Sequence, residues 1–303
     1  MDFLKIKAMQ LVDVCREHSH NGHIVITGHD NPDADSIISA VMLKRMLDAF
    51  FVESRISFCT PPDNVTLRDM RWLGIWEEDF LRGFGADDVL LLVDHHKSFY
   101  NNHVIGCVDH HTTPPEAQCQ YAHVIKASSC GKMIFDMMKA CGIATDDDER
   151  LALYSVYLDT QSCKSSKFNR ADTEWVEKCL DKYAIDRDKI ERLGFCLVSP
   201  DEPVDVVAMY AYKRYEFGKV SASTAIQIDD TLPEWRSVLS KTLDFLAKKT
   251  RDEGYALWAF VVNMPAKSRS DIYFIRDNGE VERLELDRLA SRSKDVIPVV
   301  SSL

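Results

Sequence analysis

Residues 23–50 read HIVITGHDNPDADSIISAVMLKRMLDAF. The first six residues are mostly apolar and predict a buried strand. A polar loop follows at residues 29–35, and apolar residues then recur at helical spacing, with Asp35 or Ser36 as the expected N-cap. The stretch therefore predicts a strand, a polar loop and a helix in direct succession.

The same alternation continues along the first two thirds of the chain. Apolar, β-rich runs occupy residues 55–60, 88–94 and 103–109, and helical patterns occupy residues 129–141, 147–158 and 172–193. Strands that are continuously apolar and alternate with helices are typical of a parallel sheet covered on both faces. We therefore predict an α/β fold for this part of the chain.

A second, smaller domain is expected after a break in the pattern. Residues 196–205 contain two Pro and several acids, and they interrupt the helical region. Beyond them lie strand-like runs at residues 223–229, 256–263 and 271–277 and a helix at residues 233–252. This order predicts a first domain over residues 1–195, a linker over residues 196–205, and an α+β domain with a mixed sheet over residues 206–303.

Composition excludes several classes of protein. The 303 residues are 46% hydrophobic, which argues against disorder, and the net charge of −11 disfavours nucleic acid and anionic membranes as partners. No apolar run approaches the roughly 20 residues of a membrane span, so a cytoplasmic location is expected. The nine Cys are at least 11 residues apart, which excludes a CxxC motif and favours free thiols.

Carboxylates and imidazoles gather where the predicted strands end. All ten His lie within the first 123 residues. In an open α/β sheet, ligands bind beyond the carboxyl ends of the strands, and each of four segments there carries an Asp. A single Asp after a strand is commonly a helix cap or turn residue. The joint pattern instead supplies the oxygen and nitrogen ligands that Mn²⁺ or Mg²⁺ prefers, in the segments that hold His29, Asp33 and Asp35; Asp94; Asp109, His110 and His111; and Asp159.

The spacing inside the first loop favours a pair of metal ions. Asp33 and Asp35 are two residues apart, so in an extended segment they project to one side and reach two different ions. Two ions about 4 Å apart clamp a phosphoryl group and activate water. Phosphoryl transfer is therefore the reaction that this arrangement favours.

Five motifs together resemble those of a known family. In order along the chain they are GHDNPDADSI (28–37), VDHH (93–96), VDHH (108–111), LDTQSCKS (158–165) and SRSKDVIP (291–298). The chain resembles the DHH phosphoesterase superfamily with a DHHA2-type C-terminal domain, and within it the family II manganese-dependent inorganic pyrophosphatases and the related exopolyphosphatases. The likeness runs from about residue 22 to residue 298.

The resemblance implies a role for each matching position. One metal ion would be held by His29 and Asp33, with Asp94 as the bridge to a second ion held by Asp35, His110 and Asp159. His111 would contact the substrate phosphate and supply a proton to the leaving group. The cationic clamps of the second domain would be Lys213, Arg292 and Lys294, closing on an active site in the cleft between the domains.

Several positions depart from the family pattern. The tail usually reads SR followed by two Lys, and here Ser293 separates Arg292 from Lys294. The usual F-K-S-P-T segment after Asp159 reads SCKSSKF, and Asp30 stands where a basic residue is common. These changes leave the expected metal ligands intact and alter the side that faces the substrate.

An additional imidazole pair, His95 and His96, follows Asp94. The two rings either orient Asp94 through hydrogen bonds or are simply polar residues at the mouth of a loop. The sequence leaves both interpretations open.

The resemblance therefore implies a metal-dependent hydrolase of a small anionic substrate, with Mn²⁺ as the favoured cofactor and Co²⁺ or Mg²⁺ as alternatives. Inorganic pyrophosphate is the favoured substrate. An exopolyphosphatase is the alternative, because Ser293 could leave the pocket more open, and a catalytically weak regulatory protein on the same fold is a third interpretation. The sequence also leaves a homodimer open.

Overall fold

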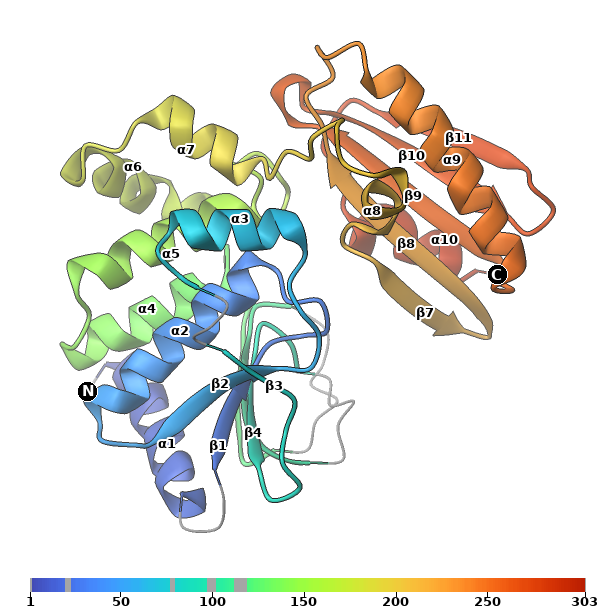
Figure 1. Cartoon of the computed structure of the whole chain (residues 1–303). Coiled ribbons are helices and arrows are strands. Elements are labelled where there is room, and N and C mark those ends of the chain that lie inside the picture. Colours follow the sequence, from blue (N-terminus) through green and yellow to red (C-terminus); the bar gives the residue numbers. More distant parts are fainter. Residues whose placement is uncertain (1, 20–22, 77–79, 97–101, 112–118, 303) are drawn as a thin grey trace. The chain divides into compact units, whose positions relative to one another are not determined.

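The computed structural model describes residues 2–19, 23–76, 80–96, 102–111 and 119–302. The chain divides into two compact units (Figure 1). The first comprises Met1–Cys163 and Lys167–Gly194, and the second comprises Lys164–Ser166 and Phe195–Leu303. Residues 196–205, expected as a linker, are grouped with the second unit, where Leu197 forms a β-bridge with Gln227.

The first unit is built on a six-stranded parallel sheet, as the apolar runs predict. Its strands are β1 (Ile24–Thr27), β2 (Ser54–Phe58), β3 (Leu81–Arg82), β4 (Val89–Val93), β5 (His103–Asp109) and β6 (Tyr121–Val124). They lie in the order β3-β2-β1-β4-β5-β6. Strands β3 and β6 and the two edge pairings that they make were not foreseen from the sequence.

The strand order reverses between β1 and β4. From β1 the chain proceeds outward through β2 to β3, and from β4 it proceeds outward on the other side through β5 to β6. Such a reversal leaves room beyond the carboxyl ends of the two central strands, because the connections leave in opposite directions. The loops that follow β1 and β4 therefore lie beside each other at the carboxyl edge of the sheet.

Both faces of this sheet are buried. The unit contains the helices α1 (Phe3–His18), α2 (Ala34–Ala49), α3 (Asn64–Trp72), α4 (Cys130–Cys141), α5 (Asp146–Asp159), α6 (Thr173–Lys182) and α7 (Arg187–Gly194). Helices α1, α2 and α4 contact the strands (Figure 1). Alternate strand residues, among them Val25, Leu90 and Leu92, form a further cluster that Phe84 and Cys119 pack against. This double burial explains why β1 and β4 are apolar at nearly every position.

Helix α2 begins earlier than the sequence predicts. Its N-cap is Asp33, whose Oδ1 accepts a hydrogen bond from the Ser36 amide at 3.1 Å, and Asp35 already lies in the first turn. The expected caps, Asp35 and Ser36, were wrong because Asp33 is in the extended conformation and reaches the amide three residues ahead.

The second unit is a smaller α+β domain with a mixed sheet, as expected. Its strands are β7 (Lys213–Phe217), β8 (Lys219–Gln227), β9 (Leu257–Met264), β10 (Arg269–Arg276) and β11 (Val281–Leu286), and its helices are α8 (Val204–Met209), α9 (Trp235–Asp252) and α10 (Ile297–Val300). The order is β11-β10-β9-β8-β7, with β8 and β9 parallel and the other pairs antiparallel. In the described part of the chain, no helix of either unit combines the length and the apolar content that a bilayer crossing requires.

The close approach of β1 to α2 depends on Gly28. A Cβ at this position would lie 2.8 Å from the Ser36 Cβ, closer than van der Waals contact allows. We expect Gly28→Ala to lower the free energy of unfolding by about 1–3 kcal/mol through overpacking. Gly85→Ala is the control, because its Cβ would find its nearest neighbour at 3.4 Å. Urea denaturation measures both, and equal stabilities of the two variants would contradict this account.

Candidate metal centre

The predicted ligands come together at the point where the strand order reverses. His29, Asp33 and Asp35 follow β1, and Asp94 follows β4. His110 and His111 follow Asp109, the last residue of β5. Asp159 is the last residue of helix α5, at the end of the helical pattern predicted for residues 147–158, so its grouping with the strand ends was wrong.

One group of ligand atoms comprises His29, Asp33 and Asp94, which lie within 4.8 Å of one another. His29 Nε2 is 3.6 Å from Asp33 Oδ2 and 3.6 Å from Asp94 Oδ2. The other ring nitrogen, Nδ1, is 2.8 Å from the Asp30 carbonyl oxygen and donates to it. This hydrogen bond leaves Nε2 as the atom that is directed at the two carboxylates.

A second group comprises Asp35, His110 and Asp159. His110 Nε2 is 3.7 Å from Asp35 Oδ2 and 3.8 Å from Asp159 Oδ2. His110 Nδ1 is 3.2 Å from the Ala127 carbonyl oxygen, so this ring also presents Nε2 to the carboxylates. Both groups have the mixed oxygen and nitrogen donors that suit a hard or borderline divalent cation.

Asp94 joins the two groups with its two oxygens. Oδ2 faces His29, while Oδ1 lies 3.1 Å from His110 Nε2. The backbone of Asp94 is left-handed, with φ of 60°, a conformation that is uncommon outside Gly. Ser36 Oγ donates to Oδ2 at 2.8 Å and fixes the carboxylate. The strained backbone and this hydrogen bond together place one carboxylate between two ligand sets.

Several atoms directed into this centre are buried without a hydrogen bond. In the described part of the chain these include Asp159 Oδ2, together with Asp94 Oδ1 and His110 Nε2, which are 3.1 Å apart as an ion pair and have no hydrogen bond. Buried polar atoms normally have partners, because leaving them without one costs free energy. Metal cations would satisfy all three atoms at once, so the residues present fit the metal ions that the sequence implies.

Asp35 is held in place by neutral donors. Its Oδ2 accepts from the Cys130 amide at 2.7 Å, and its Oδ1 accepts from the Gly131 amide at 2.9 Å and from Ser155 Oγ at 2.7 Å. The two amides belong to the first turn of α4, where the helix dipole favours an anion. A Cβ on Gly131 would lie 2.5 Å from Ser155 Oγ, so this approach requires Gly.

Crowding of charge shifts the pKa values at the centre. Burial, followed by the charge of Asp94, raises the pKa of Asp35 to about 7. The pKa of His110 is raised to about 10 because Asp159, Asp94 and Asp35 outweigh the opposing effect of burial. Burial opposes ionisation of Asp33, yet hydrogen bonding and charge from His29 hold its pKa well below the usual range. Without a metal ion, the centre therefore retains protons near neutral pH.

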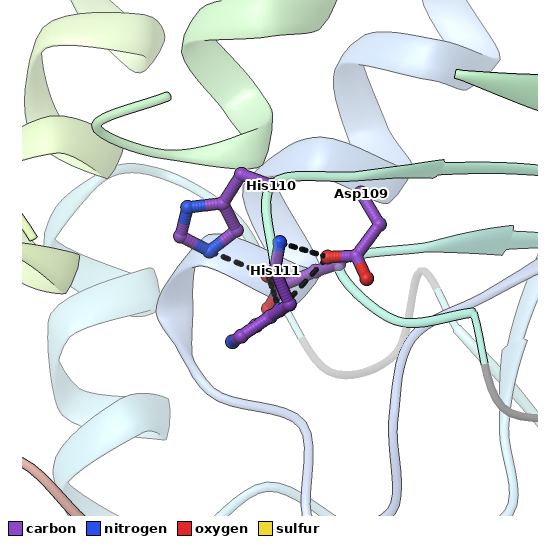
Figure 2. Close-up of side chains that lie close together, drawn as sticks. Asp109, His110 and His111 are labelled. Atoms are coloured by element: carbon purple, nitrogen blue, oxygen red, sulfur yellow. Dashed lines mark hydrogen bonds and ion pairs between the residues drawn. The ribbon is translucent and has the colours of Figure 1, made fainter. Parts of the chain in front are cut away.

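Asp109 connects two imidazoles. Its Oδ1 accepts from the His111 amide at 3.1 Å and from His111 Nδ1 at 2.8 Å, as Figure 2 shows, and its Oδ2 contacts His96 Nδ1. The His111 side chain remains 42% exposed. Asp109 thus fixes the orientation of the His111 ring through Nδ1.

The His95 and His96 rings make different contacts. His95 Nδ1 is 3.0 Å from the Val93 carbonyl oxygen, and burial lowers the pKa of His95 to about 4, so the ring is neutral. His96 contacts the Asp109 carboxylate. The hydrogen bonds described for these two rings therefore go to Val93 and Asp109. The hydrogen bond described for Asp94 comes from the Ser36 hydroxyl instead.

The cationic residues expected to bind phosphate lie in the second unit. Lys213 is the first residue of β7 and is exposed, and Lys294 is also exposed. Arg292 begins the π-helical turn Arg292–Val296, and its guanidinium donates to the Ala211 carbonyl oxygen, two residues before Lys213. Arg292 therefore lies next to the start of β7 although the two are far apart in sequence.

Sequence reasoning missed the residues that hold the ligands. These are Ser36 at Asp94, Gly131 and Ser155 at Asp35, and Lys167 at Asp159. Asp109 was among the candidates, but its hydrogen bond to His111 was not foreseen. One signal was available: Ser155 and Asp159 are four residues apart, so they lie on the same side of a helix. The pairings themselves bring together distant parts of the chain and could not be read from local pattern.

Known proteins resemble this chain in sequence over most of its length. Residues 23–160 match the DHH family, N-terminal domain. A manganese-dependent inorganic pyrophosphatase of Methanocaldococcus jannaschii is 24% identical over 306 residues, covering 90% of this chain and 96% of that protein. The matched family residues include every ligand position proposed above.

Solved structures share the fold. A crystal structure from Methanococcus jannaschii, described as a family II inorganic pyrophosphatase, superposes with a TM-score of 0.76 at 23% identity, covering 92% of this chain and 98% of that one. An exopolyphosphatase-related protein from Bacteroides fragilis gives a TM-score of 0.50 at 16% identity over 88% of this chain and 82% of that one. At these identities the likeness establishes the architecture.

Metal binding should release protons, because a metal displaces the proton of His110 and of any protonated Asp35. With pKa values of about 10 for His110 and about 7 for Asp35, Mn²⁺ affinity is expected to rise with pH from 6 to 9. Proton release should be larger at the low end of this range, where Asp35 still carries its proton. Calorimetric titration in buffers of different ionisation enthalpy measures the release, and a pH-independent affinity would refute the assignment.

Proposed function

Because residues 23–160 match the DHH family, N-terminal domain, we propose that the protein hydrolyses phosphoanhydride bonds and that inorganic pyrophosphate is its substrate. The observation that carries the proposal is Asp94, which directs one oxygen at each of two ligand groups. The similarity to a manganese-dependent inorganic pyrophosphatase supports both the reaction and the cofactor.

Two Mn²⁺ ions are proposed as the cofactor. His29 and Asp33 would hold one, Asp35, His110 and Asp159 would hold the other, and Asp94 would serve both. When bound, such a pair neutralises phosphate oxygens and activates water for in-line attack. Four carboxylates balance the charge of two divalent ions, so an anionic substrate is admitted only after both ions are in place.

His111 is proposed as the proton donor to the leaving phosphate. Asp109 accepts from Nδ1 and from the amide of His111, and these two hydrogen bonds fix the orientation of the ring. Asp109 stays ionised, since burial is outweighed by the His111 and His96 contacts and its pKa lies well below the usual range. The proton on Nε2 would then pass to the departing oxygen.

Lys213, Arg292 and Lys294 are proposed to bind the substrate phosphate. The contact of the Arg292 side chain with the Ala211 carbonyl supports a common location for Arg292 and the start of β7. Arg288 supports the turn before Arg292, because its guanidinium pairs with Asp295, which also accepts from the Ser291 amide at 2.7 Å.

The central prediction concerns the bridging carboxylate. With Mn²⁺, the wild-type protein should release phosphate from pyrophosphate, and a chelator should abolish the activity. Asp94→Asn should lower kcat by at least about 100-fold, because one oxygen can no longer serve as an anionic ligand. Asp136→Asn is the control, since Asp136 pairs with Lys132 away from the centre.

The substrate class is tested with the same preparation. Rates on pyrophosphate, tripolyphosphate and long-chain polyphosphate separate a pyrophosphatase from an exopolyphosphatase. Preference for pyrophosphate supports the proposal. Preference for long chains would reassign the substrate while keeping the reaction, and failure to hydrolyse any of them with Mn²⁺ would reject the enzyme assignment.

Arg292 should act mainly on substrate binding. Arg292→Ala is expected to raise KM for pyrophosphate by about 10-fold or more, because a charge-assisted contact is lost. Mn²⁺ affinity, measured without substrate, should stay unchanged. Arg236→Ala in α9 is the control, because it also removes one guanidinium group and should leave KM unchanged. A fall in Mn²⁺ affinity, or an unchanged KM, would show that Arg292 does not bind phosphate.

A further inference from the structure

The carboxylates at the centre are held by different kinds of donor. The Ser36 amide donates to Asp33 Oδ1, while Oδ2 of Asp33 faces His29. Two helix amides and the hydroxyls of Ser39 and Ser155 donate to Asp35. These donors are neutral, so they orient Asp33 and Asp35 without adding a full positive charge to the centre.

Asp159 is held by a cation instead. Lys167 Nζ lies 2.5 Å from Asp159 Oδ1. The other oxygen, Oδ2, is buried without a hydrogen bond and lies 3.8 Å from His110 Nε2. Of the two oxygens, one is therefore occupied by an ammonium group and the other is directed at the second ligand group.

The carboxylate of this ion pair is more deeply buried than the ammonium group. The Asp159 side chain is 6% exposed and that of Lys167 is 39% exposed. A contact between a buried carboxylate and a cation of this kind is well placed to constrain the carboxylate.

The number of oxygens that Asp159 can offer matters for the choice of metal ion. Ca²⁺ takes six to eight oxygen ligands and often binds both oxygens of a carboxylate, whereas Mg²⁺ demands near-ideal octahedral geometry at shorter distance. Mn²⁺ is bound by similar oxygen-rich octahedral sites. A carboxylate restricted to one oxygen therefore disfavours Ca²⁺ more than Mn²⁺.

We propose that Lys167 is a positioning residue that restricts Asp159 to one metal-binding oxygen and thereby selects Mn²⁺ against Ca²⁺. The inference rests on the proposed metal centre. Lys167 lies in the SCKSSKF segment, where the sequence departs from the F-K-S-P-T pattern. The selectivity is therefore a property of this chain's own residue at that position.

Lys167→Met tests this inference, because it keeps the length of the side chain and removes the ammonium. Calorimetric titration of the metal-free full chain, without substrate, gives the affinities for Mn²⁺ and for Ca²⁺. We expect the ratio of Ca²⁺ to Mn²⁺ affinity to rise by about 10-fold or more, the range seen when a residue that supports a metal ligand is lost. Lys167→Arg, which retains a cationic donor, should stay close to the wild-type ratio.

Lys182→Met is the matched control. Lys182 also pairs with two carboxylates of the first unit, Asp146 and Glu149, which are not among the proposed metal ligands. Its loss removes the same charge, so the ratio of affinities should not change. Thermal unfolding of each metal-free variant shows whether the fold is retained, and Lys167→Gln, which also removes the ammonium, keeps the test available if Lys167→Met does not fold.

Two results would overturn the inference. An equal gain in affinity for both ions in Lys167→Met would show that Lys167 contributes charge alone, and an unchanged ratio would show that it does not constrain Asp159. Absence of Mn²⁺ binding by the wild-type protein would instead reject the proposed metal centre itself. Failure of the inference is therefore distinguishable from failure of the proposed function.

Discussion

Mutual repulsion among carboxylates is the constraint on which the centre of this protein depends. Asp33, Asp35, Asp94 and Asp159 converge where the strand order reverses, and burial strengthens the repulsion among their charges. The fold meets this repulsion with protons, helix amides and Lys167, as the raised pKa values of Asp35 and His110 show. A divalent cation would remove the same repulsion more completely, so the convergence of these carboxylates favours metal binding.

The sequence was sufficient to predict the architecture of the first unit because its strands are buried on both faces. Continuous apolar runs marked β1, β4 and β5, and the polar residues at their ends marked the centre. The strand β3 was not predicted because a run of two residues carries little periodicity, and the edge strand β6 was not predicted because its residues are not all buried. Similarly, β7 and β11 are largely exposed, so burial left no pattern in their sequences.

The candidate site was likewise predicted only in part from the sequence. Residue types and order identified the proposed ligands, but the identity of the donors that hold them depends on packing between distant segments. Ser155 and Asp35 are 120 residues apart, and Gly131 is required only because α4 and α5 approach closely there. Asp159 lies at the end of a helix and Asp33 is an N-cap. The sequence did not predict these two positions, because both depend on the residue at which a helix ends or begins.

At Asp94, the left-handed backbone favours Gly for stability, whereas the proposed metal centre requires a carboxylate. A Gly at this position would adopt the same φ without the steric cost of a Cβ, which is about 1 kcal/mol for an ordinary residue. It would also remove the one carboxylate that faces both ligand groups. Random substitution followed by selection for stability alone would thus tend to erase the centre at this residue. Retention of Asp94 in related sequences would be a direct sign that the activity, rather than the fold, is under selection.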